Sequence, residues 1–373
     1  MESTCSELLD YCLRGEEWPS DLLDRAIAVD DGRSLLTVVV ERLGDLFEPR
    51  LCHVYERLFR QVIDRVKPGL PSPVRMEAKA PKDVGRVYVL SRITLGADVA
   101  VTSVLMDAAK RRYASAEIVF VGPRKNYELF EADPRVVHRE AAYARGGSLK
   151  QRLDASAALW FDDGIVLDPD SRLTQLGLIQ VCDPDRYFWF QSRSFGGDAH
   201  EPLPKLAAQW AQEVIGVEGR PYIDPVKPRG PRYDITVSLG VGENPAKRID
   251  EGFERELLRL LAKTGASVLV DKGGSSEENE RVERVLQQGM NVHNGAFAPF
   301  AAQIARSKLY VGYDSAGGHI ASACGVPLIS IFAGFASERM FQRWRPNGTV
   351  IRGDGPDLTG LVETAIRRWT HST

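Results

Sequence analysis

The stretch DSAGGHIASACGVP, residues 314–327, places an acid, a hydroxyl, a pair of glycines and a histidine between two apolar runs. Apolar runs of this length are typical of buried strands, and the pattern between them predicts a helix that starts where the first strand ends. The start of a helix presents N–H groups without partners and a partial positive charge, which suits a phosphate. This stretch is therefore the first candidate ligand site.

Several residues of this stretch are candidates for holding the ligand. Asp314 and Ser315 are natural N-cap residues. Ala316 and Gly317 carry so little side chain that a ligand can approach the backbone closely. His319 follows Ser315 by four residues, which puts both on one face of the helix. The alternative is an ordinary capped helix with a packed histidine, and this stretch alone leaves both open.

Two other chemistries do not fit these residues. GYDSAG reads G-x-x-S-x-G rather than the G-x-S-x-G of a hydrolase elbow, so a serine nucleophile is not expected. His319 has no nearby partner in an HxxxH or HxxE pattern, so no metal site is expected either.

A second candidate loop is SLGVGENPAKR, residues 238–248, which follows another predicted strand. It lacks the G-x-x-x-x-G-K-[ST] pattern of a P-loop, but Gly240 and Gly242 allow a tight turn at the strand end. The loop delivers Lys247, a cation able to neutralise a phosphate. A solvated surface lysine is the alternative.

The third candidate is Asp98, in SRITLGADVAVTS, residues 91–103. It follows the first predicted strand of the other half of the chain and lies at the start of the next helix. A carboxylate that faces a cleft from this side is suited to general-base work. It is equally suited to a first-turn acid that the helix dipole favours.

These candidates need elements that bring them together. Residues 1–75 are predicted to be helical, because apolar residues recur at i, i+3 and i+4 in LCHVYERLFRQVIDRV. From Val87 onward short apolar runs alternate with amphipathic helices, which predicts an α/β class with parallel sheets. These runs are VYVLS, EIVFVG and ALWFD in the first half, and DITVSLGV, SVLVDKGG, KLYVGYD and PLISIFAG in the second. A proline- and glycine-rich break at 219–234 divides this part, and we expect three domains: 1–75, 76–224 and 225–373. Two such α/β halves facing each other form a cleft at the carboxyl ends of their strands.

Composition narrows the function classes. The 373 residues carry a net charge of −3, which does not indicate a nucleic-acid binder. No apolar stretch approaches the ~20 residues that span a bilayer, and the polar N-terminus is unlike a signal peptide. The five cysteines show no CxxC pair, so we expect buried free thiols and a cytoplasmic location.

Taken together, these stretches resemble the ADP-heptose:lipopolysaccharide heptosyltransferases, glycosyltransferase family 9, over about residues 84–370. The strongest element is the pattern D-[ST]-x-x-x-H…A-x-G-x-P, and the loop that carries Lys247 and the stretch RITLGADVAVTSVLMDAAKRRY are also similar. The family's G-D is G-A-D here, one residue longer. The pattern is met by Asp314, Ser315, His319, Ala323, Gly325 and Pro327.

The resemblance implies a bacterial enzyme of the GT-B fold, in which two Rossmann-like domains face a cleft. It implies inverting sugar transfer without a required metal or other cofactor. The donor it favours is ADP-heptose, and the acceptor is unidentified. Asp98 would deprotonate the acceptor hydroxyl. The donor would be bound by the matching residues Lys247, Asp314, Ser315, Ala316, Gly317 and His319, with the loop of Gly240 and Gly242.

Two other functions stay open at this point. A non-catalytic nucleotide-sugar-binding or scaffold protein could keep the donor pocket and use residues 1–75 for partners or for an oligomer interface. A nucleotide-sugar epimerase could run a different reaction on the same scaffold.

Overall fold

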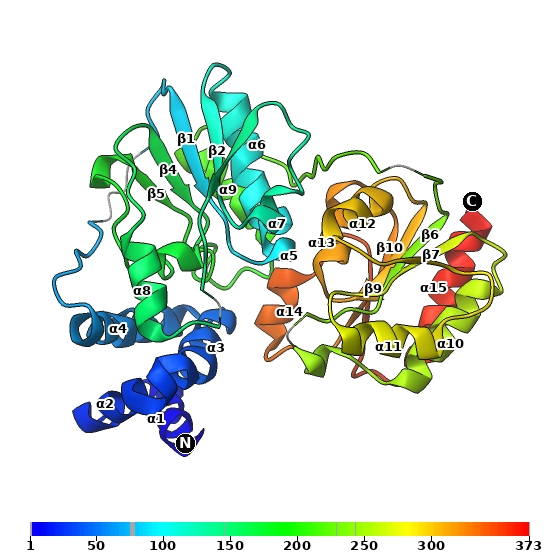
Figure 1. Ribbon diagram of the computed structural model, residues 1–373, viewed down its shortest axis with the longest axis horizontal. Coiled ribbons are helices and arrows are strands. Elements are labelled where there is room, and N and C mark those ends of the chain that lie inside the picture. Colours follow the sequence, from blue (N-terminus) through cyan, green and yellow to red (C-terminus); the bar gives the residue numbers. More distant parts are fainter. Residues whose placement is uncertain (1, 75–78, 145, 229, 243, 373) are drawn as a thin grey trace.

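The structure, a computed structural model, describes residues 2–74, 79–144, 146–228, 230–242 and 244–372. Two parallel β-sheets with helices on their faces lie side by side, and a bundle of short helices lies against the first (Figure 1). The predicted α/β class, two Rossmann-like domains behind a helical extension, is confirmed.

The first sheet has the strand order β3-β2-β1-β4-β5, and every strand pair is parallel. Parallel strands need crossover connections, which the helices α6 (Ser103–Arg112), α7 (Arg124–Tyr127) and α8 (Leu149–Ala157) help to supply. Helix α9 (Leu203–Val214) packs against α6. The strands are β1 (Arg86–Leu90), β2 (Glu117–Gly122), β3 (Val136–Glu140), β4 (Ile165–Asp168) and β5 (Tyr187–Trp189).

The second sheet has the order β11-β10-β9-β6-β7-β8 and is also parallel throughout. Its strands are β6 (Ile235–Ser238), β7 (Val268–Asp271), β8 (Asn291–His293), β9 (Leu309–Tyr313), β10 (Leu328–Phe332) and β11 (Thr349–Arg352). Its helices are α10 (Glu251–Ala262), α11 (Ser276–Val285), α12 (Phe297–Ile304), α13 (Ala316–Ala323), α14 (Glu338–Trp344) and α15 (Leu358–Ser372).

The helical extension packs on the first domain. The apolar stripe of α4 (Pro49–Val66) is buried, and its side chains share one core with Leu149 and Leu153 of α8. Lys67 and Arg152 add ion pairs to Asp154 and Glu41. The stripe is thus covered within the chain and is not free for an oligomer contact. The other helices of the extension are α1 (Glu2–Arg14), α2 (Ser20–Ala28) and α3 (Glu41–Asp45), with a π-helical segment at Leu35–Val40.

The strand expected at ALWFD is wrong, because residues 158–162 form no strand and β4 begins at Ile165. Gly164, with φ +65 and no room for a Cβ against the Arg86 carbonyl, makes the turn that delays the strand. The domain boundary expected at 75/76 lies outside the described residues. The boundary at 224/225 stays a prediction, and it lies in a segment of 217–234 without helix or strand in its described part.

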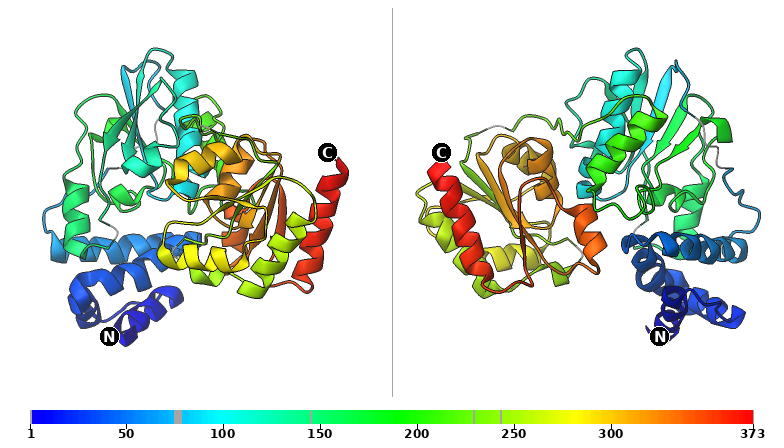
Figure 2. Two further views of the ribbon diagram at one scale, coloured as in Figure 1. Left: turned by 45° about the vertical axis from the view of Figure 1, so that its right-hand side comes forward. Right: turned by 180° about the vertical axis from the view of Figure 1, so that it is seen from behind.

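The two α/β domains share an apolar core where they meet. Val99 and Val101 of the first domain belong to the same buried cluster as Ile320 and Ala321 of α13. No helix within the described part of the chain is both long and apolar enough to cross a lipid bilayer. Figure 2 shows both domains and the extension from two further sides.

Candidate functional site

A cavity of about 570 Å³ lies between the domains, at the carboxyl ends of β1, β6, β7 and β9. Its volume is in the range of small-molecule sites, and its position is where doubly wound sheets bind ligands. Seven of the predicted donor residues line it: Gly240, Gly242, Lys247, Asp314, Ser315, Ala316 and His319. Two predicted site residues, Gly317 and Asp98, do not.

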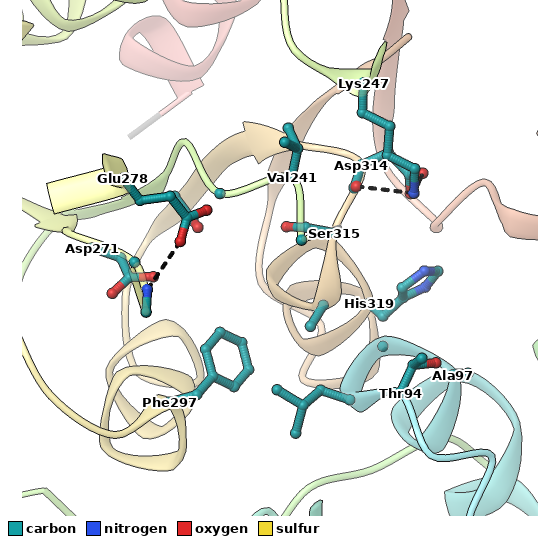
Figure 3. A pocket seen from close by; sticks show the side chains of 18 of the residues that line it. Thr94, Ala97, Val241, Lys247, Asp271, Glu278, Phe297, Asp314, Ser315 and His319 are labelled. Carbon is teal, nitrogen blue, oxygen red and sulfur yellow. Dashed lines mark hydrogen bonds and ion pairs between the residues drawn. The ribbon is translucent and has the colours of Figure 1, made fainter. Parts of the chain in front are cut away.

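The start of α13 is open toward this cavity (Figure 3). Ser315 stands at the N-cap position, but its side chain makes no capping hydrogen bond. Its hydroxyl lies instead 3.4 Å from the Tyr310 hydroxyl. The first-turn N–H groups of α13 therefore lack a side-chain cap, and Ser315 and Ala316 at this helix start line the cavity, as an anion site requires.

Gly317 allows the start of α13 to pack closely on β9. A Cβ at position 317 would lie 2.3 Å from the Tyr310 hydroxyl, so only glycine lets α13 begin this close to β9. Tyr310 is fully buried, and burial raises its pKa above the usual range. Gly317 is thus a packing residue rather than a pocket residue.

Lys247 and Asp314 form the charged pair of the site. The Lys247 Nζ donates to the Asp314 Oδ2 over 2.5 Å, with side-chain exposures of 20% and 5%. The short helix Pro245–Lys247, capped by the Asn244 side chain, brings the lysine across to the end of β9. Lysine has three donors, so it can hold this carboxylate and a phosphate together.

His319 lies beside this pair, on the second turn of α13. Burial lowers its pKa, with Lys247 adding to that effect and Asp314 opposing it. Its ring meets the Trp344 ring edge-on, with centroids 5.7 Å apart. A Cβ on Gly96 would lie 3.0 Å from the histidine Cδ2, so the first domain closes tightly on this side. His319 is therefore a neutral, packed imidazole at the edge of the pocket.

At the opposite end of the pocket lie two acids, Asp271 and Glu278, that are not among the predicted site residues named above. Asp271 ends β7, and burial raises its pKa. Glu278 on α11 accepts from the Gly274 N–H over 3.0 Å. Figure 3 shows both acids and Phe297 on one side of the α13 start, with His319 on the other. The strand-end position of Asp271 was a usable signal, because β7 was predicted and its last residue is an acid.

Asp98 does not face the cleft, contrary to what was expected for a general base. Its side chain is fully buried and accepts four hydrogen bonds of 2.6 Å. Burial raises its pKa, and these hydrogen bonds oppose the rise. In this conformation the carboxylate has no free oxygen and no contact with the cavity, so it cannot reach an acceptor hydroxyl. The donors are the Ser91 hydroxyl, the Arg92 N–H, the Thr102 hydroxyl and the Asn126 amide.

The carboxylate instead holds the turn that forms the first domain's side of the pocket. Ile93 in this turn lines the cavity at φ +73, a conformation that strains a β-branched residue. Asp98 fixes the neighbouring Ser91 and Arg92, and the Ser91 hydroxyl accepts from the Ile93 N–H over 2.8 Å. Asp98 is therefore a positioning residue for a strained pocket wall.

A π-helical turn follows the G-A-D sequence, which is one residue longer than the G-D of the family. The helix after β1 is interrupted by a π-helical turn, Asp98–Thr102, in which the Ser103 N–H donates to the carbonyl of Asp98, five residues back. A π turn accommodates one more residue than an α turn. The helix absorbs the longer loop in this way and resumes as α6.

One family model matches the domain that carries most of this site. Residues 185–365 match glycosyltransferase family 9 (heptosyltransferase), a span that contains the whole second sheet and every donor-side residue described above. No curated protein matches the chain by sequence.

Solved structures match over most of the chain. A family 9 glycosyl transferase from Veillonella parvula is 15% identical with a TM-score of 0.58, over 79% of this chain and all of that one. The E. coli heptosyltransferase WaaC with ADP is 16% identical with a TM-score of 0.56, over 77% and 99%. E. coli ADP-heptose lps heptosyltransferase II is 17% identical with a TM-score of 0.53, over 77% and 99%. At these identities the likeness shows the fold.

The chain is a glycosyltransferase of the GT-B fold. The resemblance to glycosyltransferase family 9, the heptosyltransferases, that its sequence shows is confirmed by the family match over residues 185–365 and by the likeness of fold. The extension of residues 1–75 is where it goes beyond the part expected to resemble that family.

Proposed function

We propose that the protein is an inverting, metal-independent glycosyltransferase that moves a heptose from ADP-heptose to an acceptor hydroxyl. One observation carries this proposal. The uncapped start of α13 faces the cleft with the Lys247 ammonium beside it, and the Asp271 and Glu278 carboxylates lie at the far end. This arrangement suits a diphosphate in the middle and a nucleoside with donor hydroxyls at the acidic end.

The chemistry then follows from charge. The acceptor hydroxyl attacks the anomeric carbon and loses its proton to water in the cleft, the bond from that carbon to the phosphate oxygen breaks, and ADP leaves with added negative charge. The N–H groups of α13 and the Lys247 ammonium stabilise that charge, and they do so without reorganising. Because a lysine supplies the cation at the leaving phosphate, the mechanism needs no metal there.

The acceptor enters from the first domain. That wall carries the turn of residues 93–97 and Lys125 of α7, the one charged side chain that the described residues of this domain contribute to the pocket. Gly96 of this turn packs on Ala316 at the α13 start, so an acceptor on this wall would lie close to the donor. Inversion requires the acceptor to attack from the face opposite the diphosphate. For Asp98 to act as the base, the turn would have to open and release its four donors.

The test is donor selection followed by transfer. Thermal-shift binding should show stabilisation by ADP and ADP-heptose and little by UDP or GDP sugars. Label from ADP-heptose should then reach a component of a cell extract at the same rate with and without a chelator. Lys247→Ala is the matched inactive control. Binding of another nucleotide class, or transfer abolished by the chelator and restored by a divalent metal, would contradict the proposal.

A further inference from the structure

A contact joins the helical extension to a residue that lines the pocket. Most of its buried apolar side chains pack in a core of their own with α8, but Phe47 belongs to the core that the two α/β domains share. Its ring meets the Trp344 ring edge-on, with centroids 5.8 Å apart and the planes at 88°. Trp344 in turn lines the cavity.

The backbone at Phe47 is held in an unfavourable conformation. Its φ is +56, in the left-handed region that costs a side-chain-bearing residue energy. Glycine would take this position between α3 and α4 without strain, yet a 2% exposed phenylalanine occupies it. Strain of this kind persists where the surrounding contacts require it, and the contact here is with Trp344.

Trp344 is fixed from several sides. It ends α14, which lies on the side of the second domain that faces the first domain and the extension (Figures 1 and 2). Arg343, fully buried beside it, donates to the carbonyls of Phe195 and Gly197 in the first domain. The Arg92 guanidinium lies 5.8 Å from the Trp344 ring centroid. Phe47 supplies the contact that comes from the extension.

The contact between Trp344 and His319 shows at which end of the pocket Trp344 lies. Trp344 meets His319, which lies across the α13 start from Asp271 and Glu278 (Figure 3). With a diphosphate over α13 and the nucleoside toward the two acids, the transferred sugar lies at the His319 and Trp344 end. This step rests on the proposed function.

We infer that the N-terminal extension is part of the sugar end of the active site: Phe47 is a positioning residue that sets the Trp344 wall against the transferred sugar. The extension is then more than a packing module, because its removal or displacement changes how the sugar is held. The nucleoside end of the pocket is built by α11 and the loop after β7. We therefore expect changes at Phe47 to leave the affinity for the nucleoside diphosphate unchanged.

The test compares two probes, ADP and the unreactive ADP-2-deoxy-2-fluoro-heptose, by calorimetry on the full chain. Phe47→Gly removes the ring and relieves the backbone strain, so the fold should survive. We expect ADP affinity to change less than twofold, while the ratio of the two affinities falls by about three- to tenfold, the range for a lost aromatic pair. Phe47→Leu, which keeps apolar volume, should recover part of that ratio and serves in its place if the glycine variant does not fold.

The matched control is Phe59→Leu in the extension's own core, where Phe59 stacks on Tyr55. It should lower the melting temperature and leave the affinity ratio unchanged. An unchanged ratio in both Phe47 variants overturns this inference alone. A wild-type chain that binds neither probe overturns the proposed function, and this inference with it.

Discussion

Two strand-to-helix turns face each other across the cleft, one after β1 and one after β9, and each carries an acid beside its helix start. Asp314 remains at the pocket and pairs with the Lys247 ammonium. Asp98 is turned inward, where four neutral donors surround it. The same local signal therefore gives a ligand-facing acid in one domain and a structural acid in the other. The difference lies in the partners that distant segments supply.

The largest expected effect is on folding. Asp98→Ala removes the acceptor of four buried donors, and unsatisfied buried donors are expensive, so we expect a loss of about 3 kcal/mol or more in unfolding free energy. Asp314→Ala should lose about 1 kcal/mol, because its one charged partner is partly exposed. Urea unfolding followed by circular dichroism measures both. Equal losses of unfolding free energy in the two variants would contradict the structural role of Asp98.

Asp98→Asn separates a structural role of Asp98 from a role as general base. The buried Asn126 amide has a carbonyl oxygen without a partner, so it can flip and accept from a new amide at position 98. We expect this variant to keep its fold and to lose less than about tenfold in turnover. A folded variant that loses more than about 100-fold would restore the general-base role to Asp98.

The next effect is on ligand binding. Lys247→Ala should weaken ADP binding by about ten- to a hundredfold, because it removes a charge-assisted hydrogen bond and leaves Asp314 facing the diphosphate. Calorimetry measures this, and Lys125→Ala on the opposite wall is the matched control, with a change of less than about threefold expected. Equal losses in the two variants would mean that the diphosphate is not held at α13.

The smallest effect is on the pH dependence of stability. Burial lowers the pKa of His319 below its usual 6.5, so the unfolded chain binds a proton in a range where the folded chain does not. Stability should fall as the pH drops from about 6.5 toward the folded-state pKa. His319→Gln should lose less stability than the wild type between pH 7.5 and 5.5. Parallel curves for the two proteins would show that folding does not lower the pKa of His319.

Much of the architecture follows from sequence periodicity alone. The strands at β1, β2, β6, β7, β9 and β10 were predicted because each is a short apolar run between helical patterns. The short strand β8 was not, since Asn291 and Val292 are exposed and its alternation is weak. The helix start at Ala316 was predictable because the chain places small residues directly after a strand.

The interior of the site was predictable only in part. Lys247 and Asp314 meet because β6 and β9 are neighbours, and a parallel sheet brings their carboxyl ends together. The inward turn of Asp98 depends on Asn126, 28 residues later, and on a π turn that spacing does not reveal. The contact of Phe47 with Trp344 joins residues almost 300 positions apart, across two domains. Local pattern does not encode such pairings.

A crystal structure of the full chain with ADP tests the central claim most directly. The account predicts the diphosphate at the start of α13, with its oxygens within about 3.2 Å of the first-turn N–H groups and of the Lys247 Nζ. The nucleoside should lie toward Asp271 and Glu278. A diphosphate held elsewhere, or a nucleoside at the His319 and Trp344 end, would contradict it.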